Sequence, residues 1–305
     1  MKTINIGGSG LHSSAIALGC MRIADLGTAG LTELVNECLD VGIDFFDHAD
    51  IYGGGSCEEL FGEVLAAEPS LREQMVIQSK CGIRNGFFDF SKEHILDSVD
   101  KILKRLQTEY LDILLLHRPD TLMEPDEVAE AFDTLEQSSK VRHFGVSNMN
   151  PAQIDLLQSS LRQKLVANQL QFSLAHTGMI DNGLCVNMKW EQGIDRDGSI
   201  LEYCRKENIT IQAWSVLQYG FFDGVFLGSE KYPELNSVLE RIAGENGVSP
   251  AAVAMAFILR HPAKMQAIVG STNKERVAAM AKGADMSLSR AEWYELYMAA
   301  GNQLP

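Results

Sequence analysis

Residues 111–117 read Leu-Asp-Ile-Leu-Leu-Leu-His, an apolar run of strand length that stops at an ionisable side chain. Residues 75–80, Met-Val-Ile-Gln-Ser-Lys, and residues 43–47, Ile-Asp-Phe-Phe-Asp, have the same form. Amphipathic stretches of helical length lie between such runs. This alternation predicts repeated β–α units and a parallel sheet.

Eight runs are expected to be core strands, and eight parallel strands close into a barrel whose interior is filled by side chains. The expected strands are Ala15–Gly19, Ile43–Asp47, Met75–Lys80, Leu111–His117, Val141–Ser147, Val166–Gln171, Thr210–Ser215 and Ala267–Gly270. We therefore predict a (β/α)8 TIM barrel. Two short apolar segments, Ile4–Ile6 and Leu11, predict an N-terminal β-hairpin that closes the bottom of the barrel. The 305 residues suit a single domain over residues 1–305.

The expected helices have readable ends. Thr32 is expected to cap a helix that runs to Asp40 and stops at Gly42. Ser91, Asn150-Pro151 and Ser249-Pro250 predict three further helix starts. Two connections, Phe172–Ile200 and Val216–Asn236, are long, and long loops in a compact domain are commonly lids or binding loops.

Composition limits the function classes. The formal net charge is −15, which argues against nucleic acid as the main ligand, because nucleic-acid binding proteins neutralise phosphates with basic surfaces. No signal peptide or membrane-spanning run is visible, so we expect a cytoplasmic protein without a membrane partner. Nothing in the sequence indicates an oligomer. The six cysteines form no C-x-x-C pair and no metal-binding pattern, so reduced thiols and no metal site are expected.

Polar or glycine residues end the predicted strands. They are Gly19, Asp47, Lys80, His117, Ser147-Asn148, Gln169 and Gln171, Trp214-Ser215, and Gly270-Ser271. Active sites of βα barrels lie at the carboxyl ends of the strands, so these side chains are expected to meet there. Asp47, Lys80 and His117 end three consecutive strands, and Tyr52 follows the first of them.

These same segments resemble the aldo-keto reductase superfamily. Gly42-Ile-Asp-Phe-Phe-Asp-His-Ala-Asp-Ile-Tyr-Gly53 is similar to its signature, Val76–Lys80 to its catalytic-lysine strand, and Leu111–His117 with Arg-Pro-Asp to its histidine strand. Phe144–Asn148 and Asn168-Gln169 resemble its nicotinamide-amide contacts. The resemblance runs from about residue 10 to residue 276. Within the superfamily, the stretches at His117 and Lys140 are most similar to a bacterial branch of poorly assigned oxidoreductases.

The residues suit carbonyl reduction, which needs a hydride at carbon and a proton at oxygen. A tyrosine of ordinary pKa, about 10, is a weak acid at neutral pH. The Lys80 ammonium is expected to favour the phenolate of Tyr52 and so to lower that pKa, with Asp47 holding Lys80. His117 is expected to hydrogen-bond the carbonyl oxygen. The resemblance implies the same four catalytic roles, and a nicotinamide cofactor that carries the hydride.

The resemblance also implies a set of cofactor contacts. Trp214 is expected to stack on the nicotinamide ring, and Ser147, Asn148 and Gln169 suit its carboxamide. The expected set is completed by Gly19, Met21, Arg22, Asp47, Ser215, Leu217, Gly270, Ser271, Thr272, Asn273 and Arg276. Met21-Arg22, Gly53–Gly55 and Phe87-Phe88 are expected to line the substrate entrance.

Residues 268–276, Ile-Val-Gly-Ser-Thr-Asn-Lys-Glu-Arg, resemble the segment that clasps the 2′-phosphate of NADPH. Ser271 and Arg276 match that segment, whereas well-known members have lysine where this chain has Gly270. Ala279 and Met280 also depart from it, and Lys274 is a candidate replacement for the missing lysine. The expected cofactor is therefore NADPH, with NADH as the less favoured alternative.

Other readings remain open. Asp47 and Lys80 suit a structural ion pair, His117 a buried structural histidine, and Tyr52 a rim aromatic. A cofactor-binding sensor or regulatory subunit with slow turnover is one alternative to a reductase of small carbonyl compounds. An aldolase-type lyase with a Schiff base on Lys80 is another, and it leaves Ser147, Gln169 and Arg276 unexplained.

Overall fold

The computed structural model describes residues 1–305 and contains a closed barrel of eight parallel strands. Around the barrel these are β3 (Ile16–Gly19), β4 (Phe45–Asp47), β5 (Val76–Cys81), β8 (Leu111–Leu116), β9 (Val141–Ser147), β10 (Leu165–Gln171), β11 (Thr210–Trp214) and β14 (Gln266–Val269). The predicted (β/α)8 barrel is confirmed, and each of the eight expected strands exists with ends shifted by at most two residues.

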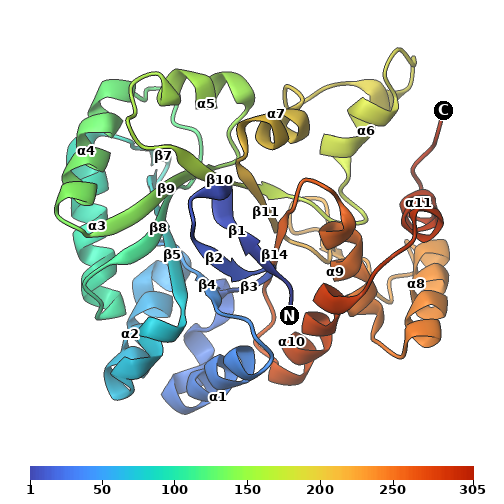
Figure 1. Ribbon diagram of the computed structural model, residues 1–305, viewed down its shortest axis with the longest axis horizontal. Coiled ribbons are helices and arrows are strands. Elements are labelled where there is room, and N and C mark those ends of the chain that lie inside the picture. Colours follow the sequence, from blue (N-terminus) through green and yellow to red (C-terminus); the bar gives the residue numbers. More distant parts are fainter.

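Helices form the outer layer around the strands (Figure 1). They are α1 (Gly27–Asp40), α2 (Ser56–Ala67), α3 (Lys92–Leu106), α4 (Pro125–Gln137), α5 (Pro151–Gln158), α6 (Gly178–Leu184), α7 (Ile200–Glu207), α8 (Pro233–Asn246), α9 (Pro250–Arg260), α10 (Lys274–Ala281) and α11 (Arg290–Ala299). Their apolar faces and the barrel strands share one continuous core, which contains five of the six cysteines, and all six are buried and free.

An antiparallel hairpin of β1 (Thr3–Asn5) and β2 (His12–Ser14) lies across one end of the barrel (Figure 1). Ile4 and Ile6 are buried there, as the sequence predicts. The Gly7 N–H donates to the Thr210 hydroxyl at 2.8 Å, which ties the hairpin to the start of β11. A Cβ at residue 7 would lie 2.5 Å from Val166 Cα, so only glycine permits this close approach.

Three of the four expected helix starts are confirmed. The side chains of Ser91, Asn150 and Ser249 each accept a hydrogen bond from the first turn of α3, α5 and α9. The prediction that Thr32 caps a helix is wrong, because α1 begins five residues before it, at Gly27. Thr32 lies inside that helix and its hydroxyl donates to the Thr28 carbonyl.

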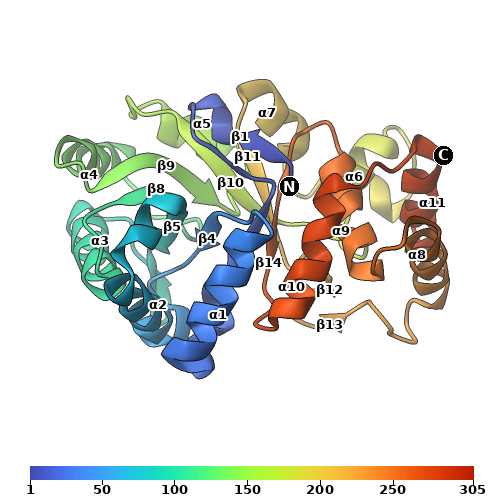
Figure 2. The same ribbon diagram turned by 60° about the horizontal axis from the view of Figure 1, so that its bottom comes forward.

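The two long connections differ in content. Residues 172–200 contain α6, whereas residues 216–236 contain β12 (Gln218–Tyr219), β13 (Gly224–Val225) and the start of α8. Figure 2 shows β12–β13 at the end of the barrel away from the β1–β2 hairpin. A second small hairpin, β6 (Ile83–Arg84) with β7 (Phe87–Phe88), follows β5.

No single helix combines the length and the apolar composition needed to cross a bilayer; only α8 and α9 taken together across a 94° bend do so. Ala252–Leu259 of α9 are buried in the protein.

Candidate functional site

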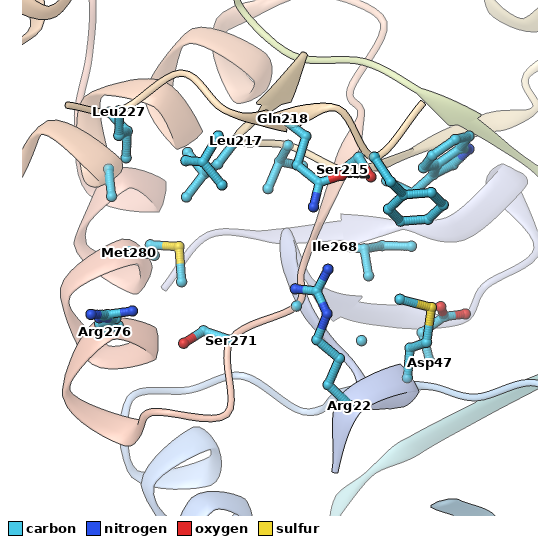
Figure 3. A pocket seen from close by; sticks show the side chains of 18 of the residues that line it. Arg22, Asp47, Ser215, Leu217, Gln218, Leu227, Ile268, Ser271, Arg276 and Met280 are labelled. Carbon is cyan, nitrogen blue, oxygen red and sulfur yellow. Dashed lines mark hydrogen bonds between the residues drawn. The ribbon is translucent and has the colours of Figure 1, made fainter. Parts of the chain in front are cut away.

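A cavity of about 920 Å³ opens at the carboxyl ends of the barrel strands. Its lining includes residues that end β3, β4, β9, β10 and β11, together with the segments that follow β8 and β14. Figure 3 shows Asp47 at one side of this cavity and Arg276 at the other, with Arg22 between them. The cavity therefore extends from the ionisable cluster at the strand ends to the first turn of α10.

The ionisable cluster is centred on Lys80. Its Nζ donates to Asp47 Oδ2 at 2.8 Å, to the His48 carbonyl at 2.7 Å and to Tyr52 Oη at 3.2 Å. These three bonds use every N–H of the ammonium. The Lys80 and Asp47 side chains are 0% and 3% exposed, so this is a buried ion pair. Neighbouring strand ends, and the 3₁₀ turn of Tyr52–Gly55, thus bring the predicted residues together.

Burial affects the titration of this cluster. Burial favours the neutral amine of Lys80, but Asp47 and Tyr52 outweigh it and raise the lysine pKa, so Lys80 is a cation at neutral pH. Burial raises the pKa of Tyr52, and the Lys80 charge only partly opposes this. The expectation of a lowered pKa for Tyr52 is therefore wrong, because desolvation of the phenol outweighs the ammonium. The phenol consequently keeps its proton at neutral pH.

His117 lies next to Tyr52, with ring centroids 6.0 Å apart and an interplanar angle of 81°. Burial, with the positive charges of Lys80 and Arg118, lowers the pKa of His117 well below its ordinary value. The ring is therefore neutral and has one N–H to donate. Its Nδ1 is buried without a hydrogen-bond partner, and the residue lines the cavity.

A chain of buried glutamines supports Asp47 from below. Gln78 Nε2 and Gln169 Nε2 both donate to Asp47 Oδ1, at 2.6 and 3.1 Å. Gln78 and Gln212 exchange two amide hydrogen bonds, and Gln212 donates to Gln266 Oε1.

Gln266 in turn donates to the Ser14 carbonyl beside the N-terminal hairpin. Sequence analysis missed Gln78, Gln212 and Gln266. The only signal in the sequence is a glutamine inside or beside each of three predicted strands.

A second chain of polar groups borders the cavity. Trp214 Nε1 donates to Asn148 Oδ1 at 3.3 Å, Asn148 Nδ2 to Ser147 Oγ at 2.7 Å, and Ser147 Oγ to the Gln169 carbonyl at 3.1 Å. Asn148 and Ser215 have φ values of 57° and 53°, in the left-handed region that side chains rarely adopt. Such backbone strain is concentrated at binding sites. All four of the predicted carboxamide and ring contacts line the cavity.

The segment after β14 only partly matches its predicted role. Gly270, Ser271 and Arg276 line the cavity, together with Gly19, Met21, Arg22, Ser215 and Leu217. Thr272 and Asn273 are not among the lining residues. Asn273 instead caps α10, and its side chain accepts the Arg276 N–H. Lys274 is paired with Glu33 at 2.7 Å, so its ammonium is already engaged.

The cavity entrance differs from expectation in part. Met21 and Arg22 line the cavity, but Gly53–Gly55 and Phe87-Phe88 are not in its wall. The turn of Tyr52–Gly55 packs on η2 (Cys20–Arg22), and Phe87-Phe88 face solvent on β7. Residues missed from the sequence include Ile51, Ile83, Arg118, Phe221, Phe222 and Val225. The length of the 216–236 connection was the one signal for the last three.

Comparison with known proteins agrees with this arrangement. Residues 15–299 match the model of the Aldo/keto reductase family. The chain belongs to the aldo-keto reductase family. It is 40% identical to the uncharacterized oxidoreductase YcsN of Bacillus subtilis, with 97% of each chain covered. It is 36% identical to a 6-dehydroglucose reductase of Agrobacterium fabrum, with 95% of each covered.

Solved aldo-keto reductases have the same fold. The thermostable enzyme Tm1743, solved with the inhibitor epalrestat, has a TM-score of 0.78 at 25% identity, with 98% of this chain and 100% of that chain covered. An aldo-keto reductase of Klebsiella pneumoniae in complex with NADPH also has a TM-score of 0.78, at 23% identity, with 99% and 96% covered. This aldo-keto reductase is accordingly an NAD(P)H-dependent oxidoreductase.

Proposed function

We propose that this enzyme uses NADPH to reduce an aldehyde or ketone, or catalyses the reverse oxidation, with Tyr52 as the proton donor. The observation that carries the proposal is the buried Lys80 ammonium, which is bonded to Asp47 Oδ2 and Tyr52 Oη, two groups of residues that line the cavity. A structural ion pair does not require a tyrosine hydroxyl as a third partner. A tyrosine that donates a proton, by contrast, requires a nearby cation to stabilise its phenolate.

The protonated phenol of Tyr52 donates its proton to the carbonyl oxygen as that oxygen gains negative charge. Lys80 lies 3.2 Å from the phenol oxygen and stabilises the phenolate that remains. Asp47 holds Lys80 in place and balances its charge. The neutral His117 ring donates its N–H to the same carbonyl oxygen and orients it toward Tyr52.

The lining fits a nicotinamide dinucleotide. When bound, the cofactor supplies the hydride. Ser147, Asn148 and Gln169 present amide and hydroxyl groups beside the ring of Trp214, which suits a carboxamide on an aromatic heterocycle. At the other side, Arg276 makes no ion pair within the protein and is free for a phosphate. The remaining lining spans the distance between these two groups.

The substrate end of the cavity favours an oxygen-rich molecule. The half-buried Arg118 guanidinium lies 5.6 Å from the ring of Trp214 and 5.7 Å from that of Phe221, and it pairs with no carboxylate. An aromatic wall with a multiple hydrogen-bond donor suits a sugar-derived aldehyde. Two relatives are 6-dehydroglucose reductases, at 36% and 35% identity, which makes 6-dehydroglucose the first candidate.

The test follows NADPH oxidation against a panel of aldehydes, ketones and quinones that includes 6-dehydroglucose. We expect turnover of at least one class, with oxygen-rich aldehydes ahead of alkyl aldehydes of equal size. Tight NADPH binding without turnover of any panel member would favour the sensor alternative. Borohydride trapping of a substrate on Lys80 without any need for cofactor would favour the lyase.

NADPH is expected to bind more tightly than NADH, because Ser271 and Arg276 are available to the additional phosphate. Arg276→Ala should weaken NADPH binding by roughly 10–100-fold and leave NADH nearly unchanged, since charged hydrogen bonds contribute about 1.5–3 kcal/mol each. Fluorescence titration of both cofactors measures this. Equal affinities in the wild-type enzyme would remove the phosphate clasp from the proposal.

His117 is expected to govern the reaction of the carbonyl more than the binding of cofactor. His117→Ala should lower kcat/KM by roughly 10²–10³-fold, the usual effect of losing one donor to a developing oxyanion. NADPH affinity should stay within a small factor. Because the pKa of His117 is far below its ordinary value, its titration should leave no break in the rate between pH 5 and 8. A large loss of cofactor affinity in a folded variant would indicate a structural histidine.

A further inference from the structure

Gln78 lies behind the ionisable cluster and outside the cavity wall. It belongs to β5, two residues before Lys80, so the two side chains lie on the same face of the strand. The Gln78 side chain is fully buried, and Gln78 is not among the residues that line the cavity. Any effect of Gln78 on the reaction must therefore pass through another residue.

The two carboxylate oxygens of Asp47 have different partners. Oδ2 accepts from the Lys80 ammonium at 2.8 Å, whereas Oδ1 accepts from the Gln78 amide at 2.6 Å and from the Gln169 amide at 3.1 Å. The carboxylate is thus held by a cation at one oxygen and by two amides at the other. The contact with Gln78 is the shortest of the three.

Asp47 acts on Tyr52 in two opposite ways. It holds the Lys80 ammonium, which lies 3.2 Å from the phenol oxygen and stabilises the phenolate. Burial is the largest cause of the raised pKa of Tyr52, but the negative charge of Asp47 adds to that rise. An N–H that points at the carboxylate offsets part of its negative charge. A donor to Asp47 should therefore make the net effect of the ion pair on the phenolate more favourable.

The Gln78 amide is fixed in the orientation that donates to Asp47. Its two N–H groups are both used, one for Asp47 Oδ1 and one for Gln212 Oε1 at 2.9 Å. Its oxygen accepts in return from Gln212 Nε2 at 3.1 Å. A half-turn of the amide would point its oxygen at the carboxylate and break the reciprocal pair with Gln212. The donor is therefore in place before any substrate binds, which is what makes such a dipole effective in catalysis.

We propose that Gln78, oriented by Gln212, is a positioning residue for proton donation by Tyr52, an inference that rests on the proposed reductase function. Gln78 holds the Asp47 carboxylate and offsets part of its charge, so that the Lys80 ammonium acts more fully on the phenol. Gln78 itself contacts neither substrate nor cofactor, because it lies outside the cavity wall.

The experiment measures kcat/KM for 4-nitrobenzaldehyde at saturating NADPH and, separately, NADPH affinity by fluorescence titration. Gln78→Met removes the donor and keeps the length of the side chain. It should lower kcat/KM by roughly 3–10-fold, a part of the effect of one hydrogen bond to a charged group, and leave NADPH affinity nearly unchanged. Gln266→Met is the matched control, because it makes the same change at an equally buried amide that does not contact Asp47. Its loss of rate should be smaller.

A double variant separates this effect from damage to the fold. Gln78→Met/Gln212→Met replaces both partners of the reciprocal pair with apolar side chains of similar length, a kind of change that can be nearly neutral for stability. Thermal melting verifies that it folds. It should lose at least as much rate as Gln78→Met, because Asp47 lacks the same donor. A normal kcat/KM in this folded variant would contradict the proposal.

Removal of the Tyr52 hydroxyl shows through which group Gln78 acts. In single-turnover reactions with enzyme in excess, Tyr52→Phe and Tyr52→Phe/Gln78→Met should have nearly the same rate, because no phenol remains to be assisted. An equal fold loss with and without the hydroxyl overturns the assignment. So does an unchanged rate in Gln78→Met, or a loss in Gln266→Met that is as large. Near-normal rates in Tyr52→Phe itself overturn the proposed function, a result seen before Gln78 is changed.

Discussion

Tyr52→Phe should reduce the rate of carbonyl reduction by roughly 10²–10⁴-fold, the usual contribution of a positioned acid. The substitution removes only the hydroxyl that Lys80 contacts at 3.2 Å and keeps the ring beside His117. NADPH affinity should be unchanged, because the phenol is assigned to the substrate. Steady-state rates and fluorescence titration of NADPH measure the two effects separately.

The pH dependence provides a second readout for Tyr52. Burial raises the pKa of the phenol above its ordinary value, so the proton is present throughout the neutral range and is lost only as the pH rises through that higher value. The wild-type reduction rate should therefore fall only at alkaline pH, and Tyr52→Phe should lack that fall. A variant with near-normal rates would exclude Tyr52 from the mechanism and favour the sensor alternative.

Lys80→Met is expected to have the second largest effect, on both rate and stability. Without the ammonium the phenolate of Tyr52 loses its stabilising charge, so the rate should again fall by roughly 10²–10³-fold. The change also leaves the Asp47 carboxylate buried without a counter-ion, which typically costs about 3–5 kcal/mol of stability. Thermal melting should show a clearly lower Tm, whereas Tyr52→Phe should melt close to the wild type.

The double variant distinguishes a shared mechanism from two independent contributions. If Tyr52 and Lys80 act as one unit, Tyr52→Phe/Lys80→Met should be hardly slower than the slower single variant. Rate losses that multiply would instead show that Lys80 contributes independently of Tyr52, for example through the stability of the fold.

The sequence predicts the barrel because each strand is an apolar run that ends at a polar residue or a glycine. The alternation of these runs with stretches of helical length can be followed along the chain without knowledge of any contact. Asp47, Lys80 and His117 could be placed together for the same reason, since all parallel strands end on one face. The pKa of Tyr52 could not be predicted, because its direction depends on how deeply the phenol is buried against how near the ammonium lies.

Contacts between segments far apart in the chain were the other features that could not be predicted from the sequence. Lys274 was a candidate phosphate ligand until the structure paired it with Glu33 on α1. Arg22, just after the first strand of the barrel, lies close to Gly270, just after the last strand. Nothing in the local sequence around either residue indicates this contact. Arg118 lines the cavity because it follows His117, although its partners Trp214 and Phe221 are about a hundred residues away in the chain.

The buried glutamines fix one another's orientation inside the barrel. An amide has a donor end and an acceptor end, whereas the carboxylate of Asp47 can only accept hydrogen bonds. Gln78 and Gln169 must therefore both turn their nitrogen toward it. Gln78 and Gln212 form a reciprocal pair, beyond which the donors point the other way: Gln212 donates to Gln266, and Gln266 donates to the Ser14 carbonyl at the other end of the barrel. None of these amides can flip alone. The amides inside the barrel thus form one hydrogen-bonded network, and a substitution at Gln266 should affect the Asp47 carboxylate although Gln266 does not line the cavity.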